Sequence, residues 1–141
     1  MTPDQVKLVQ RSFAKVAPIA DEAAAAFYDR LFEIAPEVRR MFHTPMKDQR
    51  NKLMATLSTV VAGLGNLETI LPVASALARR HVGYGVKAEQ YKLVGAALLW
   101  TLEHKLGDSW TSDTAAAWSV VYGTLSQFMI SEAYGASQAA E

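Results

Sequence analysis

Apolar side chains recur along this chain at intervals of three and four residues, the spacing that places them on one face of an α-helix. Val6, Phe13 and Val16 form the first such stripe, directly after residues 2–5, whose Thr-Pro-Asp-Gln sequence is typical of a capped helix start. Further apolar stripes predict helices over residues 47–63, 69–80, 87–106 and 111–134. No segment shows the strict alternation of a half-buried strand, so the pattern predicts an all-α fold.

Prolines and glycines mark the ends of these helices. Pro18 breaks the first helix or starts the next, and Pro36 opens a short helix that ends near Phe42. Glycines follow the later helices at positions 63, 83 and 107, where the missing side chain suits helix termination. Helices of unequal length joined by tight turns fit an irregular all-α globule better than an even four-helix bundle.

Composition and charge narrow the class of protein. The 141 residues suffice for one domain with a sizeable core. Half of them are apolar, and 14 basic residues balance 14 acidic ones, so the formal net charge is zero. The chain has no basic stripe of the kind that binds nucleic acid, no signal-peptide pattern, and no apolar run of about 18 residues. We therefore expect a cytoplasmic protein that binds neither nucleic acid nor membrane.

Three polar residues lie on apolar helical stripes and are the candidates for chemistry. Cysteine is absent, so a metal or metal cofactor would need His, Asp, Glu, Tyr or Met as a ligand. His81 ends the stripe that contains Leu77, Tyr28 lies within the second stripe, and Gln49 precedes Leu53 by one turn. A histidine at a helix end is often a surface group, an inward tyrosine can be core, and a first-turn glutamine can be half-exposed. From spacing alone, a purely structural role and a chemical role both remain open for each of the three residues.

With Tyr28, Phe42, Gln49 and His81 in this order, the chain resembles the globins over nearly its whole length. The segments 80–86 (Arg-His-Val-Gly-Tyr-Gly-Val) and 115–123 carry most of the remaining likeness. The resemblance is to bacterial single-domain globins, which correspond to a flavohaemoglobin haem domain without its reductase, and to neuroglobin-like bacterial globins. It implies a globin fold of six to eight helices enclosing one non-covalently held haem b. Residues 1–135 would form the single domain, and residues 136–141 a frayed tail.

The resemblance also implies roles for individual residues. His81 would bind the haem iron, with its other ring nitrogen on a backbone carbonyl near Leu77, while Tyr28 and Gln49 would donate hydrogen bonds to a bound gas. Tyr91 matches a tyrosine that supports the proximal histidine, whereas Glu132 falls one residue short of the matching glutamate. The remaining haem contacts implied by the resemblance are Phe42, Lys52, Leu53, Leu57, Leu77, Val86, Val94 and Leu98. Arg50 and Arg80 are alternatives to Lys52 as partners of a haem propionate, and His43 would lie at the pocket rim.

Three functional classes remain open under this resemblance. The first is reversible binding of O₂, with NO and CO as further ligands, at a five-coordinate ferrous iron, because Gln49 stands where many globins have a histidine and glutamine is a poor iron ligand. The second is nitric oxide dioxygenase activity with an external NAD(P)H-dependent reductase, because residues 1–141 carry no flavin or nicotinamide motif. The third is gas sensing. We expect a monomer or a weak dimer.

Overall fold

The computed structural model describes residues 1–43, 45–83 and 87–140, and for residues 82–83 and 133–140 it describes the backbone alone. These residues form six α-helices and three short 3₁₀-helices, with no strand among them. The elements in order are α1 (Pro3–Val16), η1 (Ala17–Ile19), α2 (Ala20–Ile34), η2 (Pro36–Met41), α3 (Met46–Ala62), α4 (Leu67–Gly83), α5 (Gln90–Leu106), η3 (Gly107–Ser109) and α6 (Ser112–Ala140). No helix in the described part of the chain is long and apolar enough to cross a membrane. The prediction of an all-α protein is confirmed.

The helix ends follow the capping signals in the sequence. The Thr2 hydroxyl accepts from the Gln5 backbone N–H at 3.2 Å, and the Gln5 side chain accepts from the Thr2 N–H at 2.8 Å, which is a complete capping box. Thr111 caps α6 by accepting from the Thr114 N–H at 3.1 Å. Gly107 ends α5 with a φ of +53°, a conformation that favours glycine because it has no Cβ.

Three helices differ from their predicted bounds by more than one residue. Helix α4 spans Leu67–Gly83 rather than residues 69–80, so Gly83 belongs to the helix that it was expected to follow. Helix α5 begins at Gln90 rather than Lys87, because residues 88–89 form a turn in which the Lys87 N–H donates to the Gln90 side chain at 2.8 Å. Helix α6 continues to Ala140, six residues past the predicted end at Tyr134, and alanine has the highest helix propensity of all residues. That residues 136–141 fray in solution stays a prediction.

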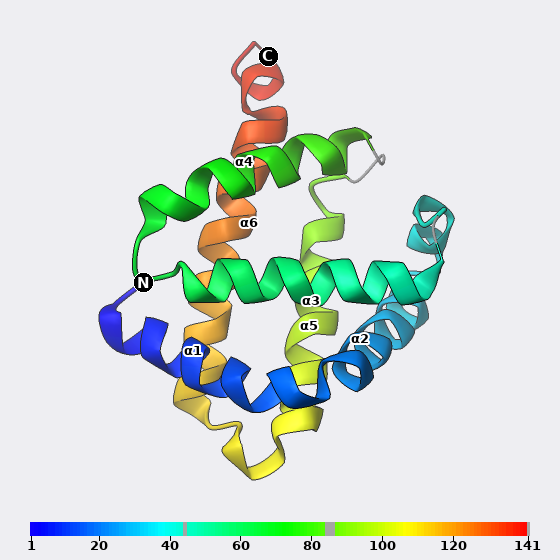
Figure 1. Cartoon of the computed structure of the whole chain (residues 1–141). Coiled ribbons are helices and arrows are strands. Elements are labelled where there is room, and N and C mark those ends of the chain that lie inside the picture. The colour runs from blue at the N-terminus through cyan, green and yellow to red at the C-terminus, as the bar shows by residue number, and fades with distance from the viewer. Residues whose placement is uncertain (44, 84–86, 141) are drawn as a thin grey trace.

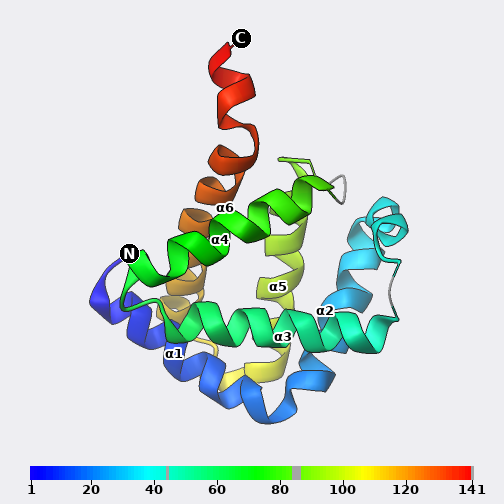
Figure 2. The same ribbon diagram turned by 45° about the horizontal axis from the view of Figure 1, so that its top comes forward.

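Helices α3 and α4 lie on the same side of α5 and α6 (Figures 1 and 2). These two helices leave the tight turn at Gly63–Asn66 and diverge, while α5 and α6 lie behind them in both views (Figures 1 and 2). Helix α2 packs on α5 and α3, and both α1 and α4 pack on α6. The end of α6 projects past α4 (Figure 2). This arrangement places Gln49 on α3 and His81 on α4, two helices that diverge from one turn.

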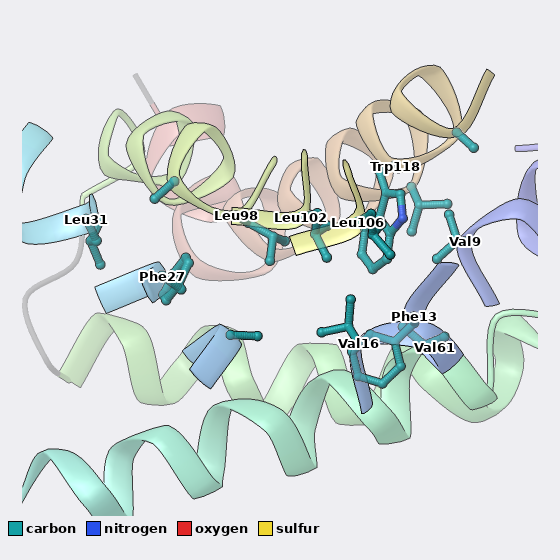
Figure 3. Packing of buried hydrophobic residues seen from close by; sticks show 14 of the residues in the cluster. Val9, Phe13, Val16, Phe27, Leu31, Val61, Leu98, Leu102, Leu106 and Trp118 are labelled. Carbon is teal, nitrogen blue, oxygen red and sulfur yellow. The ribbon is translucent and has the colours of Figure 1, made fainter. Parts of the chain in front are cut away.

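Most buried apolar side chains belong to one cluster, and α4 is anchored largely by another. The main cluster includes Val9, Phe13, Val16, Phe27, Leu31, Val61, Leu98, Leu102, Leu106 and Trp118 (Figure 3). The indole N–H of Trp118 donates to the Ser12 hydroxyl at 2.8 Å, so this buried polar atom is satisfied. The second cluster contains Ala74, Ala78, Tyr91 and Met129 and joins α4 to α5 and α6. The first turn of α4 reaches the main cluster through Ile70.

Candidate functional site

Tyr28 and Gln49 meet across α2 and α3. The Gln49 amide nitrogen donates to the Tyr28 hydroxyl at 3.2 Å, and Tyr28 is 5% exposed. Burial raises the pKa of the Tyr28 phenol, and the hydrogen bond from Gln49 opposes that rise, so the phenol is protonated at neutral pH. Because the hydroxyl accepts from Gln49, its own proton is directed to a different acceptor. The pair therefore presents two donor groups side by side.

Aromatic rings fix the orientation of Tyr28. The ring centroid of Phe27 lies 5.0 Å away, that of Phe42 5.4 Å and that of Phe32 5.9 Å. The Arg39 guanidinium lies 4.9 Å above the Phe32 ring. The sequence prediction included Phe42 but missed Phe32. Its position one helical turn after Tyr28 would have indicated that both share a face of α2.

His81 lies in the last turn of α4 with one ring nitrogen already engaged. Its Nδ1 is 2.7 Å from the Leu77 carbonyl oxygen, as the sequence led us to expect. A carbonyl only accepts, so Nδ1 carries the proton and Nε2 carries the lone pair that can bind a metal. Burial lowers the pKa of His81, the Leu77 bond opposes this, and the charge of Arg80 adds to the lowering. The imidazole is therefore held in the neutral form that a metal requires.

Tyr91 supports His81 from α5. The two rings lie 6.1 Å apart at 30°, and Tyr91 is 6% exposed. Tyr122 of α6 donates its hydroxyl to the Tyr91 backbone carbonyl, and its ring fills the space above Gly95, where a Cβ would lie 2.6 Å from a ring carbon. Glu132 is exposed on α6 and makes no hydrogen bond or ion pair with any residue that the structure describes. The sequence prediction missed the support from Tyr122 and Gly95, which no local spacing reveals.

The apolar candidates for cofactor contact pack against the two hydrophobic clusters, and most of them keep part of their surface exposed. Leu53 and Leu57 on α3, Leu77 on α4 and Val94 on α5 are half-buried, while Leu98 is buried. Half-buried aliphatic side chains on helices that diverge are what an inserted apolar molecule would cover. The described residues contain no group of three or more His, Asp or Glu side chains able to hold a metal ion. One neutral histidine instead suits a metal whose other ligands come from a macrocycle.

The charged candidates lie on the surface. Lys52, Arg80 and His43 are exposed. Arg50 donates to the Asp21 carboxylate at 3.0 Å, which leaves Lys52 and Arg80 as the simpler partners for an added anion. Val86, which the sequence placed among the cofactor contacts, lies outside the described residues.

The structure is an irregular all-α protein with a hydrogen-bonded tyrosine on α2 and a histidine on α4 that is bonded to the backbone. The family is established by comparison: the Globin family model matches residues 25–129, so the chain belongs to the globin family. A solved bacterial globin from Campylobacter jejuni has a TM-score of 0.82 and 26% identity, covering 97% of this chain and 99% of that one. The prediction of a globin fold is thereby confirmed.

Curated relatives of this chain are flavohemoproteins. One from Bordetella parapertussis is 31% identical over 134 residues, which is 92% of this chain and 33% of the relative. Another from Rhizobium meliloti is 33% identical over 118 residues, which is 79% of this chain and 29% of the relative. The chain thus spans about one third of the length of the curated relatives it matches.

Proposed function

We propose that this globin holds one haem b without a covalent link and reversibly binds O₂, NO and CO. When bound, the haem supplies a ferrous iron with one open position for a diatomic gas. His81 would hold the iron, and the observation that carries this proposal is the anchoring of its Nδ1 to the Leu77 carbonyl at 2.7 Å. That bond selects the tautomer whose Nε2 is the ligand atom and restricts rotation of the ring.

The remaining residues orient the cofactor and the gas. Tyr28 and Gln49 would donate hydrogen bonds to the gas, beside the rings of Phe27 and Phe42. Leu53, Leu57 and Leu77 cover the apolar part of the macrocycle, and Lys52 pairs with a propionate. Glutamine is a poor iron ligand, so the open position stays available to gas. Two donors favour tight binding and slow release of O₂.

A histidine substitution with a matched control tests this proposal. His104 makes the same bond to a carbonyl four residues earlier, at 2.8 Å from Trp100, but it is exposed. We expect His81→Ala to lose the Soret and visible bands of a histidine-ligated haem, and His104→Ala to keep them. Equal spectra for the two variants and the parent would remove His81 as the ligand.

A second function, nitric oxide dioxygenation, is favoured by the similarity to flavohemoproteins. The reaction joins NO and O₂ to nitrate and consumes one electron, which a separate NAD(P)H-dependent reductase would supply. Stopped-flow mixing of the O₂-loaded protein with NO, followed by cell extract and NADH, distinguishes the two functions. Rapid NADH-dependent return of the ferrous spectrum supports dioxygenation. Return of the ferrous spectrum over many minutes supports O₂ handling, with the reaction with NO as a single, incidental turnover.

A further inference from the structure

A groove of about 340 Å³ runs between α5 and α6, and among the described residues of the proposed haem site its lining includes Tyr91 alone. Lys92, Gly95, Ala96 and Leu99 line it from α5, and Tyr122 and Ile130 are among its lining residues on α6. Its volume falls within the usual range for small-molecule sites. Within α5 the lining runs from Tyr91 to Leu99, which is about 12 Å at the α-helical rise of 1.5 Å per residue.

The chemistry of the lining is apolar with one charge. Glycine at 95 keeps the floor low, where the Tyr122 ring lies, and Ala96 adds a single methyl group to the wall. Lys92 is the only charged lining residue, is exposed, and makes no ion pair within 4.0 Å with the residues the structure describes. Along α5, Lys92 is near the Tyr91 end of the lining, and Gly95, Ala96 and Leu99 follow it.

We propose that this groove binds a medium-chain monocarboxylate, with its carboxylate on Lys92 and its alkyl chain along Gly95, Ala96 and Leu99. An unpaired cation at one end of an apolar channel complements a molecule with one anionic end and one apolar tail. The exposed polar residues Ser119 and Gln127 line the same groove and keep the unoccupied surface hydrated. The proposal does not depend on haem binding.

Calorimetric titration with sodium decanoate, below its aggregation concentration, tests the proposal. It is run on the protein both as purified and after addition of one equivalent of haem, so that binding in the haem site is separated from binding in the groove. We expect saturable one-to-one binding in both forms. Octanoate should bind about tenfold more weakly, because two fewer methylene groups are buried. Decanol, which lacks the charge, should also bind more weakly than decanoate.

Two variants and one control locate the site. Ala96→Trp adds bulk at an exposed position of the groove, and we expect it to weaken decanoate binding at least about tenfold by filling the channel. Lys92→Gln should weaken binding about two- to fivefold, the effect of one exposed ion pair. Lys7→Gln, which removes an exposed lysine on α1, should leave binding unchanged.

Several results would overturn the proposal. These are the absence of saturable binding, parental affinity in Ala96→Trp at an unchanged melting temperature, parental affinity in Lys92→Gln, and equal affinity for decanol. A dimer in sedimentation analysis that Ala96→Trp dissociates would also overturn it, because a second copy of the chain would then occupy the groove.

Discussion

Replacing Tyr28 by Phe tests its proposed role as a distal donor, because the substitution keeps the ring and removes one oxygen atom. The ring contacts with Phe27, Phe32 and Phe42 lie at 5.0–5.9 Å and involve no hydroxyl atom, so they persist in the variant. The hydrogen bond from Gln49 at 3.2 Å is lost. The fold should therefore be unchanged, and the effect should appear in the binding of gas.

The expected change in the O₂ dissociation rate follows from the free energy of a hydrogen bond to a partially charged ligand. Such bonds contribute about 1.5–3 kcal/mol, which corresponds to about ten- to 150-fold in the O₂ dissociation rate if the effect falls on release. Gln49 loses its acceptor in the variant, and its amide can turn toward the ligand. Because of that compensation, we expect the O₂ dissociation rate to increase by about tenfold, near the lower limit of this range.

Stopped-flow displacement of O₂ by CO measures the dissociation rate. Thr59→Val, which removes an exposed hydroxyl from α3, is the control and should match the parent. Adding Gln49→Leu to both backgrounds gives a double-mutant cycle, in which we expect the two donors to be non-additive because they touch each other. Rates for Tyr28→Phe within about twofold of the parent would show that Tyr28 serves only in packing and would refute the reasoning.

Three further predictions concern stability. Gly95→Ala forces a methyl group against the Tyr122 ring, so we expect the free energy of unfolding in urea to fall by about 1–3 kcal/mol. Gly123→Ala is the control, because a Cβ there meets nothing within 4 Å. An equally large fall in Gly123→Ala would contradict this account. Thr2→Ala should cost about 1 kcal/mol by removing the capping box, and an unchanged thermal midpoint would show that the first turn frays already. Burial raises the pKa of Tyr28 above 10.0. The contribution of the protonated phenol to the free energy of unfolding is therefore complete below pH 10.0 and is lost as the pH rises through the raised pKa. Urea midpoints between about pH 8 and 11 should fall less steeply in Tyr28→Phe than in the parent.

Much of the fold was predictable because its signals are local. The capping box at Thr2, the glycine at 107 and the three-and-four spacing of apolar residues each act within one or two helical turns. The bond from His81 to the Leu77 carbonyl is equally local, since residues four apart on a helix are neighbours. Features of this kind can be derived from the sequence before any tertiary contact is known.

The remaining features depend on contacts between distant segments. Tyr122 and Gly95 are 27 positions apart, and their fit becomes visible only when α5 and α6 are side by side. The end of α6 was misplaced because the polar residues after Tyr134 suggested a loop, although the alanines among them favour helix. The meeting of Tyr28 with Gln49 was expected through the family resemblance and not from spacing, since they lie on different helices.

The separate anchoring of α4 has a consequence for the kinetics of cofactor exchange. Ile70 holds the first turn in the main cluster, but the half that carries His81 rests on the small cluster of Ala74, Ala78, Tyr91 and Met129. Regions with few buried contacts open at a lower free energy than the global unfolding of the protein. In the haem-free protein, the backbone amides of residues 74–81 should therefore exchange with deuterium faster than those of α5. The same local opening would set the rate at which haem enters and leaves, so that the lifetime of the cofactor is governed by one half of one helix.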